Sequence, residues 1–138
     1  MILRLLPLFS MKIPQLLLKV LIADDSSLMR KLIIKQINIF NKVNIVGEAV
    51  NGIMALEMVK TFVPDLVFLD HHMPDMNGIE VLKEIKKSKT KTIVCILTNY
   101  PYPQYKKKCL AYGADYFLYK NEDFERINSV IADTLREK

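Results

Sequence analysis

The sequence predicts an α/β fold in which five βα units, (βα)5, build one doubly wound, five-stranded parallel sheet. Five short apolar runs alternate along the 138 residues with five segments of helical period, which is the pattern of repeated βα units. Two of these runs, VLIA and LVFL, are apolar throughout, as strands buried on both faces are. A hydrophobic content of 51% with only four glycines and six prolines is typical of one compact domain.

The strands are assigned to the five apolar runs because each is short and is bounded by polar or turn-forming residues. In order along the chain they are expected at Lys19–Ala23, Val43–Glu48, Asp65–Leu69, Thr92–Leu97 and Asp115–Leu118.

Polar caps and helical spacing define the five helices. Serine and asparagine cap helices because their side-chain oxygens accept hydrogen bonds from free N–H groups of the first turn. Gly113 is the expected C-terminal cap of the fourth helix. The helices are expected from Ser26 or Ser27 to near Asn41, from Asn51 to just before Pro64, from Asn77 to the lysine-rich stretch 86–91, from about Gln104 to Tyr112, and from about Asp123 onward.

Apolar residues at helical spacing predict which face of each helix is buried. The expected faces are Leu28, Leu32, Ile33 and Ile37 in the first helix, Ile53, Leu56 and Val59 in the second, Ile79, Leu82 and Ile85 in the third, and Ile127, Val130, Ile131 and Leu135 in the last.

We divide the chain into an N-terminal extension, residues 1–17, and one domain, residues 18–138. The extension is interpreted as flexible or as an artefact of the assigned start site. Its first nine residues, MILRLLPLF, are too few to span a bilayer and carry no cleavage signature, so we expect a cytoplasmic protein without membrane attachment. Because the last helix reaches the end of the sequence, no fused effector domain is expected.

The cysteines and the excess of lysine suggest no further chemistry. Cys95 and Cys109 lack CxxC spacing and are expected to be small buried residues in a reducing compartment. The net charge of +5 comes partly from lysines at 86–91 and 106–108. No groove-reading motif accompanies them, so no nucleic acid partner is expected; a solvated surface is favoured, and acidic protein partners stay open.

Polar residues follow four of the expected strands at their carboxyl ends, where ligands of doubly wound sheets bind. The first strand is followed by Asp24 and Asp25, the third by Asp70, the fourth by Thr98, and the fifth leads to Lys120. Carboxylates gathered at one edge repel each other unless a hard cation such as Mg²⁺ compensates. An aspartate beside Mg²⁺ is a competent nucleophile toward a phosphoryl group, and hydroxyl and ammonium donors stabilise the transferred group.

Four segments carry a resemblance to a known family. VLIADDSSLMRKLI, DLVFLDHHMPDMNGIEVL, IVCILTNY and GADYFLYK resemble the motif blocks of two-component response-regulator receiver domains, and the resemblance runs from about Lys19 to the C-terminus. It implies a flavodoxin-like sheet with strand order 2-1-3-4-5. It also implies a set of site residues: Asp24 and Asp25 as the acidic metal pair, Asp70 as phosphoacceptor and third carboxylate ligand of Mg²⁺, the backbone carbonyl of His72 as a further ligand, Thr98 as the switch hydroxyl, Lys120 as the phosphate-contacting lysine, and Phe117 as the aromatic that moves with Thr98.

The resemblance implies a signalling switch that is no enzyme beyond its own phosphotransfer and autodephosphorylation. A histidine kinase or histidine phosphotransfer protein donates a phosphoryl group to Asp70. Thr98 then moves toward the phosphate, Phe117 turns inward, and the surface of the fourth helix, fifth strand and fifth helix changes its preference for a downstream protein. Whether phosphorylation also drives homodimerisation is left open.

Three features depart from the usual family pattern. Asn121 follows Lys120, where the family commonly has proline in a cis peptide. Two histidines follow Asp70; one packed and one solvated imidazole is favoured over a transition-metal site. Tyr100 and His72 are expected to flank the path of attacking water and to prolong the phosphorylated state. The stretch Tyr100–Tyr105 has two open interpretations, a partner-binding surface or packing of the helix start.

Two other functions compete with the switch. One is a phosphorylation-independent pseudo-receiver that acts as a scaffold; such proteins usually lack an acidic or lysine position that is present here. The other is a Mg²⁺-dependent phosphohydrolase of the haloacid-dehalogenase type, which uses an aspartate nucleophile. That class needs a general acid two residues after its nucleophile, where this chain has His72, and a cap domain for which the chain is too short.

Overall fold

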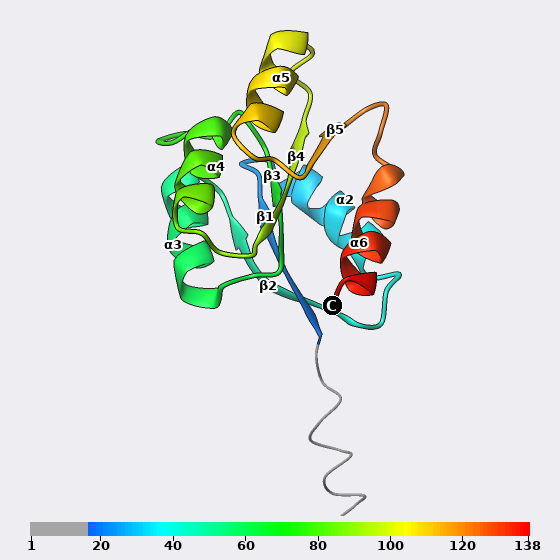
Figure 1. Cartoon of the computed structure of the whole chain (residues 1–138). Coiled ribbons are helices and arrows are strands. Elements are labelled where there is room, and N and C mark those ends of the chain that lie inside the picture. Colours follow the sequence, from blue (N-terminus) through cyan, green and yellow to red (C-terminus); the bar gives the residue numbers. More distant parts are fainter. Residues whose placement is uncertain (1–16) are drawn as a thin grey trace, which may run out of the picture.

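The computed structural model describes residues 17–138, which fold into a five-stranded parallel sheet between two layers of helices (Figure 1). The strands are β1 (Leu18–Ala23), β2 (Val43–Ala49), β3 (Leu66–Leu69), β4 (Ile93–Thr98) and β5 (Tyr116–Tyr119). The helices are α2 (Ser27–Ile37), α3 (Gly52–Phe62), α4 (Gly78–Lys87), α5 (Pro103–Ala111) and α6 (Arg126–Arg136).

The strand order is β2-β1-β3-β4-β5, which confirms the order implied by the resemblance. All four pairings are parallel, so the carboxyl ends of the strands lie at one edge. Ala23 of β1 pairs with Leu69 of β3, and Thr98 of β4 pairs with Tyr119 of β5. This register brings the residues that follow β1, β3 and β5 to the same height at the edge.

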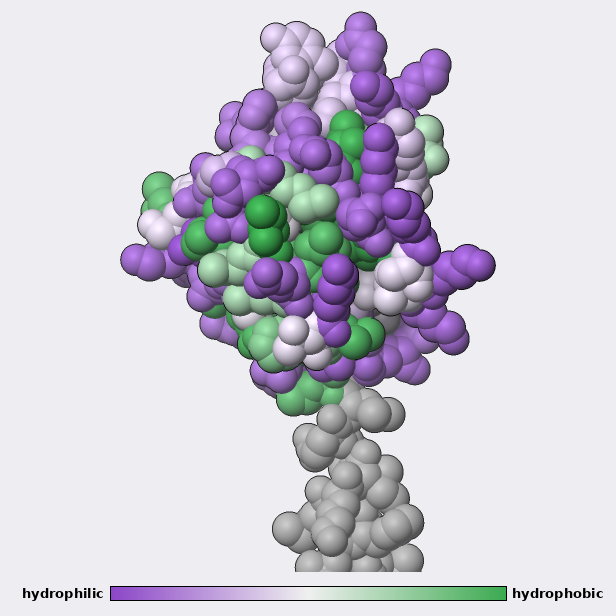
Figure 2. Space-filling view, turned by 90° about the vertical axis from the view of Figure 1, so that its left-hand side faces the viewer, coloured by the Kyte–Doolittle hydropathy of each residue, from purple (hydrophilic) through white to green (hydrophobic). Residues whose placement is uncertain are grey.

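The hydrophobic core has two parts, one on each face of the sheet. In β1, Leu21 and Ala23 face the side covered by α3 and α4, while Val20 and Ile22 face the side covered by α2 and α6. Both sets are fully buried, as expected for a central strand between two helical layers. Figure 2 shows hydrophobic atoms in the middle of the α3 and α4 side and a mostly hydrophilic top, where α5 lies.

The three predicted side-chain caps are confirmed. The side-chain oxygen of Ser26 accepts from the N–H of Met29, that of Asn51 from Met54, and that of Asn77 from Glu80. The glycine expected after the fourth helix is also in place: Gly113 has φ +101°, a left-handed conformation that side chains disfavour. The strand bounds agree with the predicted ones to within one residue.

Some predicted bounds and faces are wrong. The first predicted helix, α2, ends at Ile37 rather than near Asn41, because the chain tightens into a turn in which the N–H of Ile39 donates to the carbonyl of Gln36. The last helix, α6, begins three residues later than expected, after a turn at 121–125. Leu28, Leu32 and Ile53 are not buried but exposed.

The reason for these misplaced faces is the breadth of the apolar stripe. In α2, apolar residues occupy neighbouring positions around the helix, so the helical spacing fits more than one rotation. The structure buries Ile33 and Ile37 and leaves Leu28 66% exposed.

Residues 1–16, which contain nearly all of the predicted N-terminal extension, lie outside the described residues, and the division at residue 17 stays a prediction. Between residues 17 and 138, no helix combines the length and apolarity needed to cross a membrane. Cys95 and Cys109 are free and buried, as expected.

Candidate functional site

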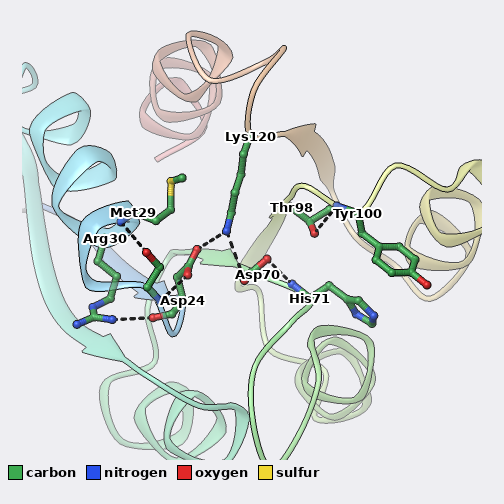
Figure 3. A network of polar contacts seen from close by, with 9 residues as sticks. Asp24, Met29, Arg30, Asp70, His71, Thr98, Tyr100 and Lys120 are labelled. Carbon is green, nitrogen blue, oxygen red and sulfur yellow. Dashed lines mark hydrogen bonds and ion pairs between the residues drawn. The ribbon is translucent and has the colours of Figure 1, made fainter.

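The predicted site residues meet at the carboxyl edge of the sheet. Asp24 and Asp25 follow β1, Asp70 follows β3, and Lys120 follows β5. Figure 3 shows the side chains of Asp24, Asp70 and Lys120 pointing toward one another from these strand ends. Parallel pairing with the register described above is what brings residues nearly 100 positions apart in the sequence into contact.

Three carboxylates form the centre of the site. One carboxylate oxygen from each of Asp24, Asp25 and Asp70 lies within 4.8 Å of the others. Asp24 and Asp70 are buried, with 2% and 5% exposure, whereas Asp25 faces solvent. Oδ1 of Asp24 accepts from the N–H of Ser26 at 2.9 Å, and Oδ1 of Asp70 accepts from the N–H of His71 at 2.8 Å. These hydrogen bonds fix the orientation of both buried carboxylates.

Lys120 supplies the positive charge. Its Nζ lies 2.7 Å from Oδ2 of Asp24 and 3.4 Å from Oδ2 of Asp70. Its backbone N–H donates to the carbonyl of Thr98 at 2.9 Å, which holds the residue against the end of β4. The peptide bond that joins Lys120 to Asn121 is trans, in contrast to the cis bond common in the family.

The surroundings of Asp70 disfavour its charged form. The pKa of Asp70 is raised to about 6, chiefly by burial, because removing a carboxylate from water costs hydration energy. The Lys120 ammonium and the His71 N–H limit this increase, and the nearby carboxylate of Asp24 contributes to it. At neutral pH the carboxyl is mostly ionised, as a nucleophile must be.

The donor set fits a hard divalent cation. Three carboxylates contribute a formal charge of −3 and Lys120 contributes +1, which leaves −2 in a site that is largely withdrawn from water. All the clustered ligand atoms are carboxylate oxygens, the type that Mg²⁺ prefers. Asp24, Asp25 and Asp70 are therefore the residues that would hold the ion; the proposed contribution of the His72 carbonyl stays a prediction.

The two proposed switch residues lie beside this centre. Thr98 is fully buried, and its Oγ1 accepts from the N–H of Tyr100 at 3.1 Å. Phe117 is also buried, with 5% exposure. Its ring packs edge-on against Tyr105 and Tyr119, at centroid distances of 5.8 and 5.2 Å.

The two histidines after Asp70 agree with the prediction of one packed and one solvated imidazole. His71 is partly buried with its ring 4.0 Å from that of Tyr105, and burial lowers its pKa, whereas His72 is exposed. The two imidazole rings nevertheless lie close to each other, with their centroids 4.8 Å apart. Within the described residues, neither belongs to a group of three or more side chains that could hold a metal.

Different residues of the stretch Tyr100–Tyr105 fit its two interpretations, packing of the helix start and a partner-binding surface. Tyr105 is buried in the core and packs the start of α5, while Tyr102 is exposed to solvent. Tyr100 lies between them, with its ring 4.9 Å from that of His72. Packing and an accessible aromatic surface are therefore both present.

Sequence reasoning missed two residues that support the site. The guanidinium of Arg30 donates to the backbone carbonyl of Asp24 at 2.8 Å and to Glu48 at 2.9 Å. A cation near a helix N-terminus is unfavourable to the helix dipole, and this was the signal that could have drawn attention to Arg30. Gly78 was also missed: an added Cβ there would lie 2.5 Å from the carbonyl oxygen of Asp70.

Comparison with known proteins identifies the family. Residues 20–132 match the model of the response regulator receiver domain. The chemotaxis protein CheY of Bacillus subtilis is 35% identical over 117 residues, which cover 85% of this chain and 97% of CheY. A protein-glutamate methylesterase/protein-glutamine glutaminase of Treponema denticola is 40% identical over 121 residues, 86% of this chain, but the chain spans only about a third of that protein's length, 32%.

Solved structures agree with this match. The signal receiver domain of the putative response regulator NarL from Mycobacterium tuberculosis superimposes with a TM-score of 0.81 at 30% identity, covering 88% of this chain and 98% of that domain. A CheX-CheY-BeF3-Mg²⁺ complex from Borrelia burgdorferi gives a TM-score of 0.73 at 28% identity, covering 86% of this chain and 87% of the matched chain. Family match, fold and the assembled acidic site agree, and the chain belongs to the response regulator receiver domain family.

Proposed function

We propose that this receiver domain is a phosphoacceptor switch that takes a phosphoryl group onto Asp70 from a phosphohistidine of a sensor histidine kinase or a histidine phosphotransfer protein. The observation that carries the proposal is the placement of Asp70. Its buried carboxylate lies between two further aspartates and a buried lysine, at the one edge of the sheet where all four meet.

The chain's own residues suit in-line transfer. One oxygen of Asp70 bonds to phosphorus as the bond from phosphorus to the donor imidazole breaks, and no general base is needed because the carboxylate is already ionised. The ammonium of Lys120, 3.4 Å from Asp70 Oδ2, is positioned to neutralise the transferred phosphoryl oxygens. Mg²⁺, when bound by Asp24, Asp25 and Asp70, supplies further neutralisation of those oxygens.

The switch then acts through Thr98. Its Oγ1 accepts a hydrogen bond from the Tyr100 N–H, so its own hydroxyl proton stays available to donate to a phosphoryl oxygen. Movement of Thr98 toward the phosphate pulls on the loop that leads into α5. Phe117, packed between Tyr105 and Tyr119, transmits this change to the surface formed by α5, β5 and α6, where a downstream protein binds.

The Borrelia burgdorferi neighbour supports the chemistry of the site. That CheY is described in complex with BeF3, Mg²⁺ and CheX. The present chain has the same fold and the carboxylate cluster that such a cation requires. We expect this chain to bind Mg²⁺ and beryllofluoride next to Asp70.

The proposal is tested by incubating the protein with acetyl phosphate or phosphoramidate, with and without Mg²⁺, and measuring its intact mass. We expect a Mg²⁺-dependent gain of one phosphoryl group that is lost in Asp70→Asn. Asp75→Asn is the matched control, because Asp75 is an exposed aspartate of the same loop and should be phosphorylated normally. If the wild type gains no phosphoryl group under any condition, the phosphorylation-independent scaffold becomes the better function.

A further inference from the structure

An arginine–glutamate pair lies beside the carboxylate site and holds the chain that carries it. Nη1 of Arg30 donates to the backbone carbonyl of Asp24 at 2.8 Å, and Nε of the same guanidinium donates to Oε1 of Glu48 at 2.9 Å. Figure 3 shows the Arg30 side chain reaching from α2 to the Asp24 carbonyl. Arg30 thus connects α2 and the end of β2 to the peptide bond between Asp24 and Asp25.

The Asp24 carbonyl lies just beyond the regular hydrogen bonding of β1. Ala23 and Ala49 are the last paired residues of β1 and β2, and the Asp24 N–H still donates to the Ala49 carbonyl at 3.0 Å. The carbonyl of Asp24 accepts from the Arg30 side chain instead of from a neighbouring strand. A hydrogen bond from a guanidinium is stronger than one between neutral groups, so this side chain fixes the orientation of the peptide.

Asp25 depends on this peptide more than the other two carboxylates of the site do. The buried carboxylates of Asp24 and Asp70 each accept a backbone N–H. The Asp25 side chain faces solvent, and within the part of the chain that the structure describes it makes no hydrogen bond or ion pair. Its direction is therefore set by the backbone. Arg30 holds that backbone on both sides, because its N–H also donates to the Ser26 carbonyl at 3.0 Å.

The charges of the pair cancel, which matters so close to a cation site. An unpaired guanidinium beside the three carboxylates would disfavour the binding of a metal ion by repulsion. Glu48 compensates this charge at 2.9 Å, and the Arg30 side chain is only 14% exposed, so the ion pair is partly withdrawn from water. The pair therefore supplies a strong hydrogen-bond donor to the Asp24 carbonyl without adding net charge.

We propose that Arg30 is a positioning residue for Mg²⁺: by fixing the peptide between Asp24 and Asp25 it holds the Asp25 carboxylate close to those of Asp24 and Asp70. Glu48 keeps the guanidinium in place. The proposal rests on the Mg²⁺ site of the proposed function. Residues that orient a metal ligand without touching the metal typically change its affinity by about 10- to 100-fold when they are removed.

The test is calorimetric titration of the full chain with MgCl₂. Arg30→Met removes both hydrogen bonds, and we expect Mg²⁺ to bind about tenfold more weakly. Loss of the positive charge alone would have the opposite sign, because it makes the site more negative. Lys31→Met is the matched control: this exposed lysine of the same helix carries the same charge, and its removal should leave Mg²⁺ binding unchanged or slightly tighter. Arg30→Lys keeps the charge but not the forked donor, and should bind about threefold more weakly than the wild type.

A double-mutant cycle shows whether Arg30 acts through Asp25. In Asp25→Asn, which keeps an oxygen ligand without its charge, a further Arg30→Met or Arg30→Lys should not weaken the residual binding of Mg²⁺. The lysine variant serves for this cycle if circular dichroism shows that Arg30→Met does not fold. Binding by Arg30→Met that is as tight as in the wild type or tighter, or an equal loss with and without the Asp25 carboxylate, would overturn the proposal while phosphorylation of Asp70 still occurs. A wild type that binds no Mg²⁺ would overturn the proposed function as well.

Discussion

The ammonium nitrogen of Lys120 lies 2.7 Å from Oδ2 of Asp24 but 3.4 Å from Oδ2 of Asp70. Lys120 and Asp24 are both almost completely buried, so water screens their attraction only a little. The lysine is therefore closer to a proposed metal ligand than to the proposed phosphoacceptor. Asp70 is left as the less compensated of the two buried carboxylates, in agreement with its raised pKa.

Removing this lysine should have opposite effects on stability and on metal binding. Lys120→Met leaves two buried carboxylates without their cation, and we expect a loss of about 3 kcal/mol in the free energy of unfolding when EDTA is present. The same change makes the site more negative, so Mg²⁺ should bind more tightly than to the wild type. Urea denaturation and calorimetric titration measure the two effects.

The control for that variant is Lys87→Met, which removes an exposed lysine whose ion pair with Glu84 lies at the surface. It should alter neither quantity appreciably, because exposed ion pairs contribute little. Weaker Mg²⁺ binding by Lys120→Met would show that the lysine supports the metal site rather than competing for its carboxylates.

The pKa of Asp70 predicts a pH-dependent difference between the wild type and Asp70→Asn in the absence of metal. The pKa is raised in the folded state to about 6 from 3.8, so between these values the folded protein binds more protons than the unfolded chain. Stability relative to Asp70→Asn therefore falls as pH rises from about 4 to 6. Above that range the wild type should be the less stable protein, by at most about 3 kcal/mol.

Urea denaturation in EDTA at pH 4 and pH 7.5 measures this difference. Comparing the two proteins at each pH cancels the titration of all other groups. A difference in free energy that is the same at both pH values would contradict the raised pKa, and saturating Mg²⁺ at pH 7.5 should reverse the sign because it stabilises only the wild-type site.

Gly78 should not tolerate a side chain. A Cβ at this position would lie 2.5 Å from the Asp70 carbonyl oxygen and 2.8 Å from the His71 Cα, both of them backbone atoms. Gly78→Ala must shift the segment that carries Asp70, and we expect a loss of about 2 kcal/mol in stability together with slower phosphorylation. Gly47→Ala is the matched control, since its nearest contact is the flexible Met58 side chain at 3.0 Å.

The lifetime of the phosphorylated state should depend on Tyr100 and His72. Their rings lie 4.9 Å apart, and His72 follows Asp70 by two residues, so we expect the two rings to restrict the approach of water to the phosphoaspartate. We expect Tyr100→Ala and His72→Ala each to accelerate loss of the phosphoryl group by about tenfold, equivalent to about 1.4 kcal/mol in the barrier. Release of inorganic phosphate from the phosphorylated protein measures the rate.

Tyr102→Ala serves as the control for these variants, because Tyr102 is exposed and its ring contacts Tyr100 rather than His72. Its rate should stay close to that of the wild type. Rapid hydrolysis in the wild type itself, with no acceleration in either variant, would show that the two rings do not shield the phosphoaspartate.

The sequence alone was sufficient for the architecture and for the centre of the site. Apolar runs between helical segments determine parallel strands, and parallel strands bring their carboxyl ends to one edge. For this reason the sequence predicts that Asp24, Asp70 and Lys120 lie together. The caps at Ser26, Asn51 and Asn77 were equally predictable, because each satisfies N–H groups only a few residues away.

Only the tertiary structure decided the features that depend on rotation and on long-range packing. Helical spacing did not determine whether Leu28 or Ile33 faces the sheet, since both belong to one broad apolar stripe. The preference of Lys120 for Asp24 over Asp70 depends on differences of less than 1 Å between side chains from three strands. Likewise, residues of α4, of α5 and of the loops after β3 and β4 line one groove beside Tyr105, and no local pattern brings these four segments together.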